Sequence, residues 1–98
     1  MFFLLAFLVY EVILRKNIIR FNDVYGITLA SSKNNKVVEN ILTSNNDKGM
    51  FIYKSDNNEI IKNEINKNKW EGITIVNSDN NSLKENVIMA NEYDLIIK

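Results

Sequence analysis

The sequence predicts an α+β fold, in which an N-terminal apolar helix precedes a small, mainly antiparallel β-sheet. A dense block of large apolar side chains is confined to the residues before Arg15. From Lys36 onward, short apolar runs alternate with clusters of Asn, Asp, Ser and Gly, which is typical of strands and turns. The 98 residues have room for one core. We therefore divide the chain into a helical anchor or assembly segment, residues 1–32, and a small Asn-rich β-rich domain, residues 33–98.

The first predicted element is a helix from Phe2 to about Phe21. Residues 2–14 read FFLLAFLVYEVIL, which is apolar on every face apart from Glu11. At about 1.5 Å per residue this run spans ~20 Å as a helix, less than the ~30 Å hydrocarbon core of a bilayer. No basic residue precedes the run, so a cleaved secretory signal is not indicated. The helix is expected to lie in a membrane or to pack against like subunits.

The second half of the chain is interpreted as hairpins. Residues 37–42 and 50–54 flank a turn-forming segment and predict the first hairpin. Residues 59–65 suit either a strand or a short helix, and strand is favoured. The β-branched residues within 70–76 predict a strand. Residues 82–97 are read as a terminal hairpin, with a short helix opened by a capping box as the competing interpretation.

The side chains expected in the core of this sheet are Ile52, Trp70, Ile73, Ile75 and Leu95. The aromatic residues Phe51, Tyr53 and Trp70 are either core or an exposed stacking platform, and core is favoured because the domain is small. Asn, Ile and Lys are abundant and Pro is absent, which we interpret as codon usage in an AT-rich genome.

Composition argues against catalysis and cofactor binding. The chain has no His and no Cys, which removes imidazole acid–base catalysis, thiol chemistry and the usual zinc sites. Twelve basic and twelve acidic residues are interspersed, so no basic face for nucleic acid is indicated. The five glutamates at 59, 64, 71, 85 and 92 read as solvated surface, and residues 77–81 as a turn rather than a calcium loop. We predict no enzyme, no cofactor, no metal site and no small-molecule ligand.

The run from Phe2 to Tyr10 resembles the opening of bacterial type IV pilins and competence pseudopilins. Those proteins begin with an aromatic residue, a short apolar run and an acid at the fifth position. Two registers are open: a mature chain that starts at Phe2 has Ala6 at the fifth position, and one that starts at Phe7 has Glu11 there. The resemblance implies a minor pilin or pseudopilin, a structural subunit anchored and polymerised through its N-terminal helix. The membrane and assembly contacts it implies are Phe2, Phe3, Leu4, Leu5, Phe7, Leu8, Val9, Tyr10 and Glu11.

The resemblance also implies the partners and the location. The partners are the membrane or like subunits, and the location is membrane-associated or the bacterial cell surface. The alternative is a small soluble binding module, cytosolic or phage-encoded, in which the N-terminal helix packs as core.

Overall fold

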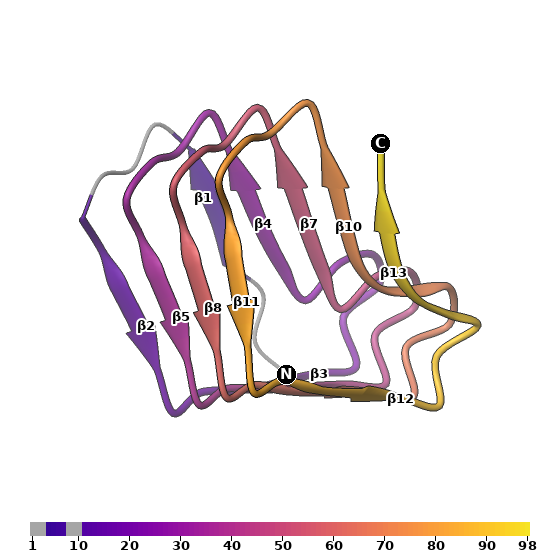
Figure 1. The fold of residues 1–98 in the computed structure, drawn as a ribbon. Helices are drawn as coiled ribbons and strands as arrows, with labels where there is room; N and C mark the ends of the chain where they lie inside the picture. The colour runs from indigo at the N-terminus through magenta and orange to yellow at the C-terminus, as the bar shows by residue number, and fades with distance from the viewer. Residues whose placement is uncertain (1–3, 8–10) are drawn as a thin grey trace.

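The computed structural model describes residues 4–7 and 11–98, and this part of the chain forms a parallel β-solenoid of about four turns (Figure 1). Each turn adds one strand to each of three parallel sheets. Hydrogen-bonded neighbours on successive turns are mostly 23 residues apart. The repeating unit is therefore a coil of short strands rather than a hairpin.

The sheets are named here by their strands, in spatial order. Sheet 1 consists of β1 (Leu4–Phe7), β4 (Ile27–Ala30), β7 (Met50–Tyr53), β10 (Glu71–Val76) and β13 (Tyr93–Ile97). Sheet 2 consists of β2 (Ile13–Arg15), β5 (Lys36–Val38), β8 (Glu59–Ile61) and β11 (Ser82–Lys84). Sheet 3 consists of β3 (Ile18–Arg20), β6 (Ile41–Thr43), β9 (Glu64–Asn66) and β12 (Val87–Met89).

Left-handed backbone corners separate the strands of each turn. In the third turn they fall at Lys54, Asn57, Lys62 and Lys67, with φ between 48° and 58°. None of the positive-φ residues in the described chain is glycine. A helix needs negative φ at every residue, so these closely spaced corners exclude helix and leave room only for short strands.

The core is a set of apolar stacks inside the coil. In sheet 1, Ile27, Met50 and Ile73 occupy equivalent positions on successive turns, and each is fully buried. The buried cluster as a whole comprises Ile19, Ile27, Leu29, Val37, Leu42, Met50, Ile52, Ile60, Ile65, Ile73 and Ile75. Each turn thus buries its apolar side chains against the turns on either side.

Asparagine has a structural role at three of the corners. Asn40 donates its backbone N–H and its side-chain amide to Asn63 Oδ1, at 2.9 and 3.1 Å. Asn63 repeats both bonds with Asn86 Oδ1 and also donates to the carbonyl of Val37. Equivalent ladders run through Asn35, Asn58 and Asn81, and through Asn22, Asn45, Asn68 and Asn91. These buried amides satisfy corner backbone groups that no strand reaches, which explains the abundance of Asn through the fold itself.

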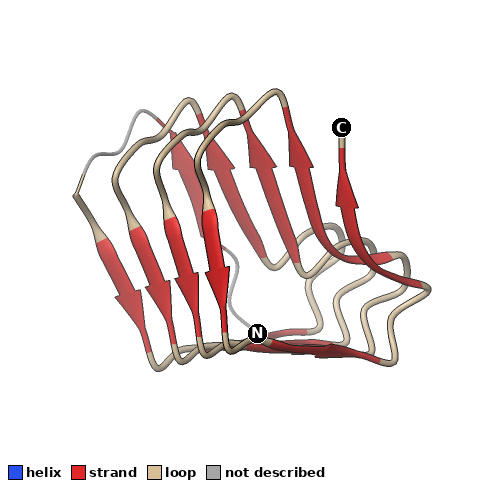
Figure 2. Cartoon of the chain, in the orientation of Figure 1, coloured by secondary structure: helices blue, strands red, loops and turns tan. Residues whose placement is uncertain are grey.

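The predicted N-terminal helix is wrong. Its described part contains β1, β2 and β3, separated by positive-φ residues that include Glu11 and Lys16. Each of these strands pairs with the strand one turn later, which satisfies the backbone groups that a helix would have satisfied internally. Figure 2 shows strands and loops throughout the described chain. No helix with the length and apolar character to cross a bilayer occurs within residues 4–7 and 11–98.

The predicted antiparallel hairpins are also wrong. The proposed hairpin partners at 37–42 and 50–54 lie in different sheets, because β5 and β6 belong to sheets 2 and 3 and β7 belongs to sheet 1. Similarly, β12 pairs with β9 and β13 pairs with β10, so no terminal hairpin forms. Polar corners bend the chain toward the next sheet instead of reversing it.

Several local predictions are confirmed. Residues 59–65 form strands β8 and β9, and most of 70–76 forms β10. Among the expected core residues, Ile52, Ile73 and Ile75 are buried. Trp70 and Leu95 are instead 47% and 44% exposed, so those two predictions are wrong. Trp70 lies just before β10 at a corner, and Leu95 lies on β13, which pairs on one side only among the described strands.

Candidate ligand-binding face

The outer face of sheet 1 carries a group of aromatic side chains, which makes it the candidate binding face in the described chain. In β7, Met50 and Ile52 point into the core, so Phe51 and Tyr53 point outward, because side chains alternate along a strand. Tyr25 lies just before β4, one turn before β7, and its ring contacts that of Phe51. The preferred prediction that Phe51, Tyr53 and Trp70 are core is therefore wrong, and two of them contribute to an outward aromatic surface.

The three rings form a continuous strip. The ring centroids of Tyr25 and Phe51 are 5.3 Å apart with an interplanar angle of 43°, and those of Phe51 and Tyr53 are 6.1 Å apart with an angle of 20°. Tyr25 and Phe51 lie on successive turns, whereas Phe51 and Tyr53 share β7. We call Tyr25, Phe51 and Tyr53 the aromatic strip.

A lysine lies at each end of the aromatic strip. Lys48 Nζ is 5.4 Å from the ring centroid of Tyr25 and 5.9 Å from that of Phe51. Lys54 Nζ is 5.2 Å from the ring centroid of Tyr53. At these distances the ring quadrupoles attract the ammonium groups. The strip therefore presents apolar ring surface with an ammonium group near each end.

The environment of Lys48 keeps its side chain protonated. Burial alone would lower the pKa of Lys48, but a hydrogen bond to Asp47 and the charges of Asp47, Glu71 and Tyr25 outweigh burial, and the net pKa is above its ordinary value. Lys48 Nζ lies 3.0 Å from Asp47 Oδ1 and 3.6 Å from Glu71 Oε2. Lys48 is accordingly a fixed cation and is not available as a base near neutral pH.

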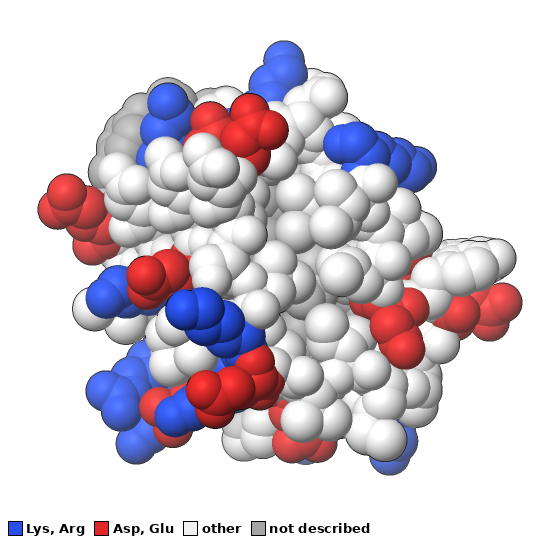
Figure 3. All heavy atoms as spheres, viewed as in Figure 1, with Lys and Arg blue, Asp and Glu red and all other residues white. Residues whose placement is uncertain are grey.

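Charged residues elsewhere are mixed in sign. On sheet 2 and its following corner, Arg15 pairs with Glu39 at 3.3 Å, and Lys36 pairs with Glu59 at 3.7 Å. In the view of Figure 3, blue and red side chains are interspersed and no broad area of one sign is present. These exposed pairs contribute little stability and offer no concentrated charge to a ligand.

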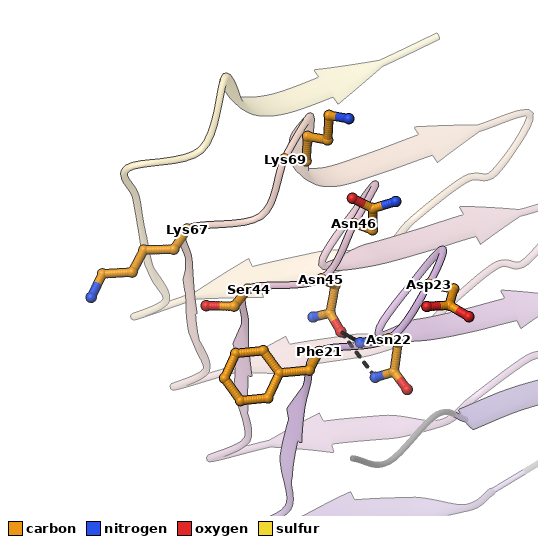
Figure 4. Close-up of a pocket in the computed structure, with 8 residues that line it drawn as sticks. All are labelled: Phe21, Asn22, Asp23, Ser44, Asn45, Asn46, Lys67 and Lys69. Carbon is orange, nitrogen blue, oxygen red and sulfur yellow. Dashed lines mark hydrogen bonds between the residues drawn. The ribbon is translucent and has the colours of Figure 1, made fainter.

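A hollow of about 530 Å³ lies at the corner that follows sheet 3 and is the other candidate site. Figure 4 shows Lys67 and Lys69 extending from it in different directions. Phe21 lies two turns before Lys67, after β3. The buried Asn22 and Asn45 beneath it are occupied by the ladder, with Asn22 Nδ2 donating to Asn45 Oδ1 at 2.9 Å. Because its cations do not converge, this hollow is a weaker candidate than the aromatic strip.

The residues predicted as membrane and assembly contacts do not form an anchor helix. Leu4, Leu5 and Phe7 belong to β1, and Glu11 occupies a positive-φ corner. The others, Phe2, Phe3, Leu8, Val9 and Tyr10, lie outside the described residues. The predicted partners, a membrane or like subunits bound through the helix, are therefore wrong.

Sequence reasoning missed the repeat, although the sequence contains its signal. The pairs Asn34-Asn35, Asn57-Asn58 and Asn80-Asn81 recur at the spacing that separates hydrogen-bonded turns, 23 residues. Gly26, Gly49 and Gly72 recur at the same spacing, and an added Cβ at each would lie within 2.6 Å of another heavy atom. A search for self-similarity before element assignment would have indicated a solenoid.

Comparison with known proteins agrees with the repeat architecture. Residues 8–98 match the family described as "Periplasmic copper-binding protein (NosD)". The chain belongs to the NosD family. No curated protein matches the sequence.

Because the family match is to NosD, the pilin resemblance is wrong, and so are the assignments to a type IV pilus, competence and a transmembrane helix. The alternative soluble module is not supported either, because the helix meant to form its core is absent from the described chain.

Solved structures similar to this NosD-family chain are those of an alginate epimerase. The periplasmic alginate epimerase AlgG is 26% identical over 98% of this chain, with a TM-score of 0.77. A single-substitution variant of that enzyme is 27% identical over 94% of this chain, again with a TM-score of 0.77. This chain spans about 27% of the epimerase's length. Both the family and the epimerase are named as periplasmic, which is compatible with the cell envelope, the coarser part of the predicted membrane or cell-surface location; no membrane anchor is shown within residues 4–7 and 11–98.

The donor set of this chain does not fit copper, the metal in the family's description. Copper sites use thiolate, thioether and imidazole ligands, and the chain has no Cys and no His. Met50 is fully buried in the core, and Met89 is exposed on sheet 3. Within residues 4–7 and 11–98, no group of three or more His, Cys, Asp or Glu is arranged to hold a metal. The described residues therefore do not form a copper site.

We expect copper to leave the stability of this chain unchanged. A ligand that binds the native state raises the thermal midpoint in proportion to the logarithm of its concentration. Titration with copper(II) sulfate, followed by differential scanning calorimetry, should give a constant midpoint. A saturable rise that a chelator reverses would contradict this expectation and show that the chain has a copper site.

Proposed function

We propose that this chain is part of a periplasmic β-solenoid protein and that its aromatic strip binds an acidic polysaccharide. The observation that carries the proposal is the ring surface of the strip with the exposed Lys54 at its Tyr53 end. Lys54 forms no ion pair within the described residues, whereas Lys48 is already paired with Asp47 and Glu71. The apolar C–H faces of sugar rings pack on aromatic side chains, and carboxylates pair with ammonium groups. A chain of uronic acid residues offers both features at regular intervals.

The comparison with AlgG supports the same class of ligand. That enzyme is named as an alginate epimerase, and alginate is an acidic polysaccharide. The identity of 26% and the TM-score of 0.77 extend over nearly the whole of this chain. Because this chain spans only about 27% of the epimerase, the proposal takes over the class of ligand and not the reaction.

The proposed role of this stretch is binding without catalysis. Epimerisation and eliminative cleavage of a polyuronate both begin with removal of a proton, which requires an unprotonated base near the substrate. Lys48 is held as a cation by its raised pKa, and the carboxylates of Asp47 and Glu71 face Lys48. Lys54, beside the Tyr53 ring and without an ion pair among the described residues, is the cation that can meet an anionic ligand.

We expect Tyr53→Ala and Lys54→Gln each to weaken binding of alginate oligosaccharides about tenfold, which is the loss typical of a central aromatic or charged contact. The first variant removes ring surface, and the second removes one of the flanking charges. Isothermal titration calorimetry at low ionic strength measures the affinity, and added salt should weaken it because the charge contacts are exposed to solvent.

Matched controls separate the strip from general surface effects. Phe21→Ala removes an exposed ring that also lies beneath a cation, with Arg20 Cζ 5.3 Å from the ring centroid, but on another corner. Lys62→Gln removes an exposed lysine that occupies a positive-φ corner, as Lys54 does. Both controls should bind as the unaltered chain does. Equal weakening by the controls, equal binding of neutral dextran, or no binding of alginate would overturn the proposal.

A further inference from the structure

Two threonine hydroxyls on the outer face of sheet 1 lack a hydrogen-bond partner. Thr28 is 7% exposed and Thr74 is 2% exposed, and the Oγ1 atom of each is buried and unpaired. Their flanking strand residues, among them Leu29 and Ile75, belong to the core. Strand alternation therefore directs both threonines outward. A buried hydroxyl without a partner is unfavourable and rare in native proteins, which makes two on one face informative.

The aromatic strip connects the two hydroxyls. Phe51 is in register with Thr28 on β4 and with Thr74 on β10, so it stands between them in the same outward row. Phe51 is also the middle ring of the strip. Its side chain is half-buried. Phe51 is therefore the residue that neighbours both threonines in the outward row.

We infer that Thr28 and Thr74 are sugar-binding residues, each donating its hydroxyl hydrogen to a carboxylate or hydroxyl oxygen of the polysaccharide once the Phe51 ring is displaced. The inference rests on the proposed function and deepens it by naming the polar contacts of that face. In the ligand-free fold each hydroxyl is buried without a hydrogen bond, which costs free energy. A hydrogen bond to the ligand would remove that cost and so favour binding. An unsatisfied polar group also discriminates against ligands that cannot pair with it.

The test uses Thr28→Val and Thr74→Val in the full chain, with two measurements on each variant. Valine has nearly the same shape and suits a strand, but it has no hydroxyl. We expect the thermal midpoint to rise by a few degrees, because an unsatisfied polar group is removed from the ligand-free fold. We expect the affinity for alginate oligosaccharides to fall about fivefold. A rise in the thermal midpoint together with a fall in the affinity would support the inference, since a purely structural threonine would change the midpoint and leave the affinity unchanged.

Two controls complete the experiment. Thr43→Val removes a hydroxyl that already donates to Asn66 Oδ1 at 2.7 Å on sheet 3, so it should lower the midpoint and leave the affinity unchanged. Thr28→Ser and Thr74→Ser keep the hydroxyl and should keep the affinity. If the unaltered chain binds and both valine variants bind equally well, this inference is overturned and the proposed function stands. If the unaltered chain does not bind, both are overturned.

Discussion

Replacing Asn45 with alanine is expected to destabilise the fold by about 3 kcal/mol, because it leaves several buried backbone and amide groups unpaired. Asn45 Oδ1 accepts hydrogen bonds from the backbone N–H and the side-chain amide of Asn22. Its Nδ2 donates to the carbonyl of Ile19 at 3.3 Å and to Asn68 Oδ1 at 2.9 Å. Solvent cannot readily replace these bonds, since Asn45 itself is only 2% exposed. Urea denaturation followed by circular dichroism measures the change in the free energy of unfolding.

The adjacent residue provides the control. Asn46 is exposed at the same corner, so Asn46→Ala should change the free energy of unfolding by less than about 0.5 kcal/mol. The two variants have the same composition and differ only in which amide is lost. Equal stability of the two variants would mean that the ladder makes no net contribution to folding.

The second large effect is expected at the glycine column. A Cβ added at Gly49 would lie 2.6 Å from Ile65 Cγ2, 2.8 Å from the carbonyl oxygen of Gly72 and 2.9 Å from Asn68 Nδ2. None of these atoms moves aside easily, because Ile65 is β-branched and fully buried, the carbonyl belongs to the backbone of the next turn, and the amide belongs to a ladder. Gly49→Ala should therefore separate two turns and cost about 3 kcal/mol, at the upper end of what overpacking produces.

The same denaturation experiment tests this prediction, with Asn46→Ala again as the control for a surface change. Gly49→Ala should also increase hydrogen exchange at the amides of the third turn, because the strain falls between that turn and its neighbour. A variant as stable as the unaltered chain would show that the turns can separate without loss of packing.

Local sequence signals located many strands correctly but not their partners. The β-branched residues Ile73, Thr74, Ile75 and Val76 indicated a strand, and β10 occupies that segment. The Asn-rich segments indicated bends, and they are bends. Hairpin pairing failed because a bend near 44–49 can either reverse the chain or direct it to another sheet, and nearest neighbours in the sequence carry no information on that choice.

The N-terminal segment shows the limit of composition alone. A run of apolar side chains suits a membrane helix as well as the first turn of a solenoid, because both bury apolar surface. The distinguishing observation is the repeat of Asn and Gly at the spacing of 23 residues, which places Asn17 and Asn40 on successive turns. Once that register is known, strands are expected at Ile13–Arg15 and Ile18–Arg20, on either side of the corner at Lys16.

The sequence by itself determined the chemistry that the chain lacks, since a chain without His or Cys has no imidazole and no thiol wherever it folds. It also indicated the positions of turns and three of the buried isoleucines, Ile52, Ile73 and Ile75, because these follow from local residue types. Only the tertiary structure decided that the strands are parallel, that Trp70 is outside the core, and that Tyr25 joins Phe51 and Tyr53 in one strip. The physical reason is that these features arise from stacking between turns, which brings together side chains that no local pattern relates.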